Sequence, residues 1–281
     1  MKYLTKEFYN AMQKMSLRYP LRASKKAEVF SEDYFKKLYK KEEDKRIKER
    51  KAAYEVKFED MFPEELTEEL AYSFDLVELA PEEAQKAYLE QREQLKYNFD
   101  SRPKLSVEQE MKRFKQAFRN RLNYLNKLLP EHILQKVADI RVLAMNVAAP
   151  EVKKEITAYC KQNKKLVFST LDAYKKQLNK QFGPNAPFEE ELNLHDNVVL
   201  SCRKRGKDIV LTIDNSYGYS TFSTIVFKNC TVIKQDAPLH GAWFLYNEIY
   251  KSGDKFELHF LLEKHNKLID YTILTDGVNA F

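Results

Sequence analysis

The chain has 281 residues, of which 43% are apolar and 32% charged, and its formal net charge is +6 at pH 7. This length and apolar content suffice for one large core or two modest ones and exclude a wholly disordered chain. No run of 18 apolar residues occurs, and the first residues interleave lysine with apolar side chains, so we expect neither a membrane span nor a signal peptide. Three scattered cysteines, Cys160, Cys202 and Cys230, exclude a disulfide scaffold and favour a reducing, cytoplasmic location.

The distribution of glycine divides the chain into two kinds of structure. All six glycines follow Phe182, and glycine disfavours helix interiors while it serves tight turns between strands. The sequence therefore predicts an α+β fold, with a multi-helix bundle over 1–182, a linker over 183–187, and an antiparallel β-meander or small barrel over 188–281. Residues 1–187 hold 38 Lys/Arg against 29 Asp/Glu, whereas residues 188–281 hold 10 against 13. We expect these halves of opposite net charge to dock on each other.

Apolar residues recur at helical spacing in the first part of the chain, and prolines and capping residues mark the breaks. Ser106 and Gln109 form a capping box, and the stretch after Pro130 is apolar nearly all round, as in an enclosed helix. Within that stretch, Asp139 and Arg141 face different sides of a helix and need ion-pair partners from neighbouring helices. The predicted helices cover about 5–17, 31–61, 106–129, 133–148 and 150–182, with two further starts at Pro63 and Pro81.

The period of apolar residues changes to two after the linker, which is typical of strands. The predicted strands lie near 197–203, 208–214, 221–228, 230–235, 241–250, 255–263 and 267–275. Short loops between them favour an up-and-down antiparallel sheet, curled or closed into a barrel.

Two positions in the β region could contact a ligand. His195 and Asp196 stand before the first strand, but adjacent strand residues point to opposite faces, so we expect them to need partners from elsewhere. The only tryptophan lies in an aromatic strand whose alternation places Trp243, Leu245 and Ile249 on one side and Phe244, Tyr246 and Tyr250 on the other. Aromatic side chains are common interface anchors, so we predict His195, Asp196, Trp243, Tyr246 and Tyr250 as binding residues, with packing against the helical module as the alternative for the aromatic strand.

A basic stripe on the 106–129 helix offers a different interaction. It consists of Lys112, Lys115, Arg119 and Lys127, and clustered cations of this kind neutralise phosphates. A solvated helix face is the alternative interpretation, because acidic residues are mixed through the other helices and no nucleic-acid recognition motif is present.

Motifs for catalysis, metal binding and phosphate binding do not occur. The five histidines show no zinc spacing, and neither glycine-rich phosphate-binding loop is present. We therefore predict no catalytic residue, no metal and no cofactor.

Several segments are similar to a known family in their order and spacing. They are 2–9, 137–144, 194–196, 225–229, 243–250 and 256–262. Through them nearly the whole chain resembles the domain-of-unknown-function family of Gram-positive bacteria numbered four thousand and eighty-five. The resemblance implies a bacterial, cytoplasmic protein and supplies no activity and no functional residues. The tail is also similar to small β domains of bacterial immunity proteins, through its meander and its His-Asp opening.

These observations favour a non-enzymatic factor, immunity-like or regulatory, that binds another protein. One alternative is binding of nucleic acid or another polyanion through the basic helix faces. The second is an enzyme with a site at the interface of the two modules near His195. The sequence leaves the oligomeric state open.

Overall fold

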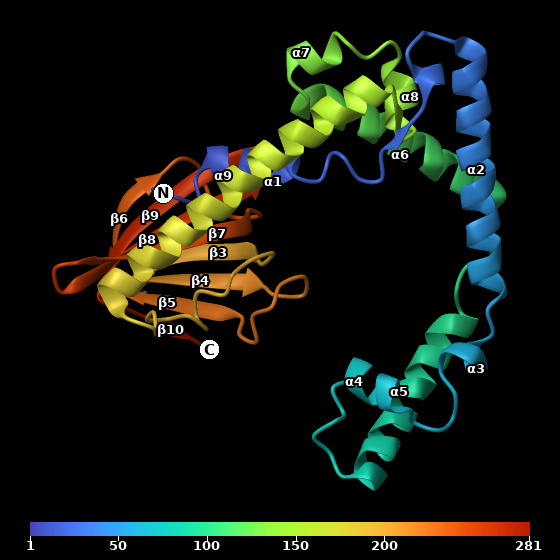
Figure 1. Cartoon of the computed structure of the whole chain (residues 1–281). Coiled ribbons are helices and arrows are strands. Elements are labelled where there is room, and N and C mark those ends of the chain that lie inside the picture. Colours follow the sequence, from blue (N-terminus) through green and yellow to red (C-terminus); the bar gives the residue numbers. More distant parts are fainter. The chain divides into compact units, whose positions relative to one another are not determined.

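The computed structural model describes all 281 residues, and its helices precede its large sheet along the chain (Figure 1). The predicted fold class is confirmed, and the antiparallel sheet stays open instead of closing into a barrel. Contacts divide the chain into two compact units, which we call the sheet unit (Met1–Pro20 with Lys153–Phe281) and the helical unit (Leu21–Val152). Gly183, with a φ of 76°, follows the last helix, at a position where a left-handed glycine commonly ends a helix.

The helical unit is built from short and long helices joined by capped turns. Its elements are β1 (Arg22–Ala23), a 3-10 helix (Lys25–Ala27), α2 (Glu32–Glu55), α3 (Phe58–Met61), α4 (Glu68–Ser73), α5 (Pro81–Asp100), α6 (Val107–Leu128), α7 (Glu131–Leu134), α8 (Ile140–Ala144) and β2 (Val147–Ala148). The predicted caps Ser31 and Ser106 accept backbone N–H groups of α2 and α6. The helix start predicted at Pro63 is wrong, because Thr67 caps the next helix through its hydroxyl group.

The single enclosed helix predicted over 133–148 is also wrong, although much of the stretch is buried. It contains α7, α8 and β2, and β2 pairs in parallel with β1. The Asp139 carboxylate accepts the N–H of Arg141 and so caps α8, and it also bonds the Arg141 guanidinium at 2.9 and 3.0 Å. Arg141 pairs further with Glu32 at 2.8 Å. The two residues therefore bind each other because Asp139 stands at a helix start and not inside a helix.

The sheet unit contains one eight-stranded antiparallel sheet with two helices. The strands are β3 (Val198–Arg205), β4 (Asp208–Asp214), β5 (Thr224–Lys228), β6 (Thr231–Gln235), β7 (Trp243–Ser252), β8 (Lys255–Lys264), β9 (Lys267–Thr275) and β10 (Gly277–Ala280), and the helices are α1 (Lys6–Lys14) and α9 (Pro150–Phe182), which joins the unit at Lys153. The strand order is β10-β5-β4-β3-β7-β8-β9-β6. All seven predicted strands occur, and β10 is an eighth that adds to β5 at one edge.

Alternation along the strands gives this sheet two different faces. On one face, apolar residues such as Leu211, Phe227 and Phe260 form the main core, against which Leu178 and Phe182 at the end of α9 pack. On the other face, α1 and the middle of α9 form a second, smaller core through residues that include Phe8 and Val167. The first and the last helix of the chain, α1 and α9, therefore both pack on the sheet.

A buried carboxylate fastens the N-terminal segment to the second face. The Glu248 side chain, fully buried on β7, accepts the backbone N–H groups of Lys2 and Tyr3 at 2.7 Å each, and that of Leu4. The Tyr250 hydroxyl donates a fourth hydrogen bond at 2.7 Å. Burial and this bond to Glu248 raise the pKa of Tyr250, so the hydroxyl remains a donor. The segment before α1 is thereby held to the middle of the sheet.

Replacement of Glu248 tests how much this anchor contributes. We expect E248Q to lower the free energy of unfolding by about 2–4 kcal/mol, because an amide cannot accept from all four donors and leaves buried N–H groups unpaired. Urea denaturation at pH 7 measures the loss. E263Q is the matched control, since Glu263 accepts only the Tyr9 hydroxyl among the described bonds and lies nearer solvent. Equal losses in the two variants would contradict the anchoring role.

Candidate partner-binding surface

Trp243 lies in a row of side chains that crosses four strands of the sheet. In the strand register, Val198 pairs with Asp214 on one side and with Trp243 on the other, and Trp243 pairs in turn with Glu263. Directly paired residues project to the same face of a sheet. Trp243 is 39% exposed, whereas the next residue, Phe244, points into the core. The face opposite the main core therefore presents an indole ring in a row that has a carboxylate at each end, and one of these, Glu263, accepts the Tyr9 hydroxyl of α1.

A tyrosine from the loop between β4 and β5 extends this row. The Tyr217 and Trp243 ring centroids lie 5.5 Å apart with an angle of 44° between the planes, and Tyr217 is 68% exposed. Two rigid aromatic side chains in contact offer a large apolar area at a small cost in conformational entropy. We call Tyr217, Trp243, Asp196, Asp214 and Glu263 together the Trp243 surface.

Buried polar side chains fix the loop that carries Tyr217. The Asn197 amide donates to the Ser220 hydroxyl at 2.5 Å, and that hydroxyl donates to the Asn193 carbonyl, also at 2.5 Å. Asn215 donates to the carbonyls of Ser220 and Phe222 at 2.9 and 3.1 Å. Gly218 lies so near this network that a Cβ atom would stand 1.8 Å from the Asn197 amide oxygen. The loop is therefore ordered by contacts that only glycine permits at residue 218.

His195 and Asp196 contact each other, contrary to the expectation from strand alternation. The His195 Nδ1 lies 2.9 Å from the Asp196 carboxylate, and both side chains are about half exposed. Asp196 has a φ of 65° and precedes β3, so alternation does not govern the pair. The Asp196 N–H donates to the Phe244 carbonyl at 3.0 Å, which places the pair next to Trp243. His195 also lies 6.1 Å from the Tyr246 ring, between centroids.

Tyr246 and Tyr250 occupy positions different from the rest of the predicted set. A bulge between Phe244 and Tyr246 shifts the alternation of β7, so Phe244 and Ile249 both face the main core. The alternation predicted for this strand is therefore wrong beyond Phe244. Tyr246 packs edge-on against Phe8 of α1 at 5.3 Å, and Tyr250 is buried beside Glu248. The structure brings His195, Asp196, Trp243 and Tyr246 near one another, and it places Tyr250 in the N-terminal anchor.

Carboxylates give the Trp243 surface an acidic character that the sequence did not predict. Hydrogen bonds from the hydroxyl and the backbone N–H of Ser216 lower the pKa of Asp214, so its charge persists well below neutral pH. Tyr217, Asp214 and Glu263 were absent from the predicted binding residues. Asp214 ends a predicted strand, but strand register, which sets its neighbours, depends on pairing across the sheet.

The basic stripe lies on α6 in the helical unit. Lys112, Lys115, Arg119 and Lys127 are all exposed, and Lys112 pairs with Glu108 at 2.8 Å, one helical turn away. The whole helical unit holds 26 Lys/Arg and 26 Asp/Glu, so it carries no surplus of positive charge. The surplus predicted for residues 1–187 instead lies in 1–20 and 153–182, which belong to the sheet unit.

The fold and this surface define an α+β protein with an open antiparallel sheet and an exposed aromatic patch beside carboxylates. A family model described as "Protein of unknown function (DUF4085)" matches residues 96–275, most of the chain, and the protein belongs to this family. The family predicted from the resemblance is therefore confirmed. Comparison with curated proteins and with solved structures finds no significant match. None of the helices has the length and apolar character needed to cross a membrane.

Substitution of Gly218 tests whether the loop positions Tyr217. We expect G218A to destabilise the protein by about 1–3 kcal/mol and to separate Tyr217 from Trp243, because the new methyl group overlaps the Asn197 amide. The emission of the single tryptophan should then shift to longer wavelength as the indole gains solvent contact. G277A is the control, since a Cβ there would meet only Phe188, at 4.0 Å. An unchanged emission spectrum in G218A would show that the loop tolerates a side chain.

Proposed function

We propose that the protein is a non-enzymatic binding factor, and that the Trp243 surface recognises a protein segment carrying a lysine or arginine next to apolar residues. One observation carries this proposal: a partly exposed indole in tilted contact with the Tyr217 ring, in register with Asp214 and Glu263. Aromatic residues are the commonest anchors of protein interfaces, and the neighbouring acids select the charge of what binds. An immunity-like or regulatory role in the cytoplasm fits this kind of recognition.

The chemistry of the surface favours a cationic side chain. A lysine or arginine over the face of tryptophan is attracted by the ring, and a neighbouring carboxylate adds a charge-assisted hydrogen bond. Asp214 pairs in register with Val198, the neighbour of Trp243, and Asp196, about half exposed, donates its backbone N–H to the carbonyl of Phe244. The apolar neighbours of such a cation would contact Tyr217 and Val198. The surface thus offers aromatic and anionic groups to a single side chain and its neighbours.

The order of the loop also supports binding. Asn197, Ser220 and Asn215 hold the loop by hydrogen bonds before any partner arrives. Because the side chains are already in place, little conformational entropy is lost on association, and more of the contact energy appears as affinity.

A peptide array with Leu–X–Leu centres tests the charge preference. We expect centres with arginine or lysine to bind and those with glutamate or alanine to bind at least tenfold more weakly, because glutamate is repelled by Asp196 and Asp214 and alanine makes no ion pair with them. The best peptide is then titrated while the emission of Trp243 is followed. Binding to W243F, which has no tryptophan emission, is measured by calorimetry, and its affinity for the peptide should be the same. W243A should weaken peptide binding by about 30-fold, the loss typical of a central anchor.

Y72A is the control variant, because Tyr72 in the helical unit is as exposed as Tyr217, at 68%. Its affinity for the peptide should equal that of the unchanged protein. Equal binding of arginine and glutamate centres would overturn the proposal. So would a neutral oligosaccharide that shifts the Trp243 emission when no peptide does.

Polyanion binding through α6 is the weaker candidate, because the helical unit is neutral overall and Lys112 is already paired. It predicts that duplex DNA binds at low salt with an affinity that falls steeply as salt rises. The double variant K115E/R119E should then weaken binding at least tenfold in fluorescence anisotropy. Unchanged anisotropy of labelled DNA at 20 mM salt, which is about the lowest practical ionic strength, would rule this function out.

The enzyme alternative rests on His195 alone. The described polar partner of His195 is Asp196, and no contact of this pair with a serine or cysteine nucleophile is described. The binding role therefore has the better support.

A further inference from the structure

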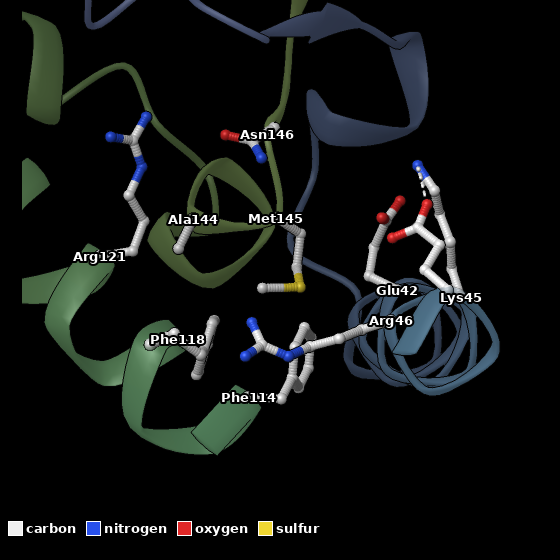
Figure 2. A pocket seen from close by; sticks show the side chains of 11 residues that line it. Glu42, Lys45, Arg46, Phe114, Phe118, Arg121, Ala144, Met145 and Asn146 are labelled. Carbon is white, nitrogen blue, oxygen red and sulfur yellow. Dashed lines mark ion pairs between the residues drawn. The ribbon is translucent and has the colours of Figure 1, made fainter. Parts of the chain in front are cut away.

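A cavity of about 320 Å³ lies in the helical unit, apart from the Trp243 surface. It opens between α2, α6 and the end of α8 (Figure 2). Its apolar lining consists of Phe114, Ala117, Phe118, Ala144 and Met145. This volume is at the lower end of what ligand pockets occupy, and a methionine adapts its shape to what lies against it. The cavity is therefore large enough for one small organic molecule.

Two arginines from different helices line the same cavity. In Figure 2, Arg46 reaches from α2 toward Phe118, and Arg121 rises from α6 toward the level of Asn146. No carboxylate is described within ion-pair distance of Arg121, whose nearest described ring is Tyr124 at 5.6 Å. Partial burial lowers the pKa of Arg121, in keeping with a guanidinium that has no described carboxylate partner. Arg121 is thus a partly desolvated cation at the edge of the cavity.

Arg46 shares its only described counter-charge with two other cations. Glu110, which is 3% exposed, lies 2.6 Å from Arg113, 3.4 Å from Arg50 and 3.5 Å from Arg46. Burial alone would raise the pKa of the Glu110 carboxyl. The hydrogen bonds and positive charges of Arg113 and Arg50 have the larger effect and hold this pKa below its usual value. The Arg46 Nε atom is buried and makes no hydrogen bond. One carboxylate cannot neutralise three guanidinium groups.

The remaining carboxylates of the cavity are already paired. Glu42 bonds Arg22 at 2.7 Å, and Glu49 lies 3.7 Å from Lys45. The charge around the cavity is consequently positive on balance. Arg46 and Arg121 are only partly buried, and a bound anion would stabilise such partly desolvated cations that lack a full counter-charge.

The backbone keeps this cavity in shape. Asn146 has a φ of 60°, its carbonyl accepts the N–H of Arg22 at 2.8 Å, and Val147 pairs with Arg22 in the β1–β2 ladder. The Asn146 side chain lines the cavity near Arg121 (Figure 2). The polar groups therefore stand on fixed elements and not on a free loop.

We infer that this cavity binds a small organic acid, with its carboxylate at Arg121 and Asn146 and its planar apolar body against Phe118 and Met145, toward Arg46. The Arg121 guanidinium bonds carboxylate oxygens, the Asn146 amide group offers a further donor, and Arg46 adds positive charge at the other side of the cavity. The apolar body replaces water over the two phenylalanine rings. A polyphosphate does not fit this lining, because more than half of the named wall residues are apolar or carry their own negative charge.

Titration with 2-naphthoate tests the inference on the full-length protein. Calorimetry at 150 mM salt should show that the protein binds 2-naphthoate at least tenfold more tightly than 2-naphthamide, its uncharged isostere. R121Q should weaken 2-naphthoate binding by at least tenfold, since a charge-assisted hydrogen bond is lost, and R121K should retain part of the affinity. R119Q is the matched control on the same helix, because Arg119 is exposed and does not line the cavity.

The controls separate binding from folding. Circular dichroism and the thermal midpoint show whether R121Q is folded, and F118A should remove 2-naphthoate binding while leaving Arg46 and Arg121 in place. Equal affinity for 2-naphthoate and 2-naphthamide would overturn the inference. So would equal losses in R119Q and R121Q, or an absence of 2-naphthoate binding at millimolar concentration in folded protein. Binding of inorganic phosphate as tight as that of 2-naphthoate would also overturn it, because the apolar part of the ligand would then contribute nothing.

Discussion

The architecture of the sheet unit depends on the carboxylate of Glu248. A fully buried carboxylate must find donors, and the neighbouring backbone N–H groups of Ile249 and Lys251 on β7 are bonded to Tyr174 and Gln181 of α9. The N–H groups of Lys2, Tyr3 and Leu4 fill this need. The requirement of one side chain thus selects the face on which the chain's first residues lie. It also explains why α1, far from β7 in sequence, belongs to the same compact unit.

Much of the fold could be predicted from local patterns. Helix α9, the caps of α2 and α6, and seven strands follow from period, proline and glycine, which act over a few residues. The failures share one cause. At 133–148 the apolar run predicted one helix, but the capping bond of Asp139 divides the stretch. In β7 a bulge shifted the alternation after Phe244. Both depend on where hydrogen bonds are made, which composition does not specify.

The candidate surface shows the same division. Trp243, His195 and Asp196 were identified because their residue types are unusual where they stand. Tyr217, Asp214 and Glu263 join them through strand pairing and a loop fixed by Asn197, and these relations span residues distant in sequence. The location of complementary charges also differs from the prediction. The predicted complementarity between basic helices and an acidic sheet occurs inside the sheet unit, where Lys6 of α1 lies 3.2 Å from both Asp236 and Asp270.

The two proposed binding sites differ in charge and are built in different units. The Trp243 surface combines aromatic rings with carboxylates and suits a cation, whereas the cavity beside Arg46 and Arg121 combines aromatic rings with guanidinium groups and suits an anion. Each site takes all its named side chains from one compact unit, so neither needs the other to be formed. Variants of Trp243 and of Arg121 should therefore act independently, since additivity holds for sites without shared partners.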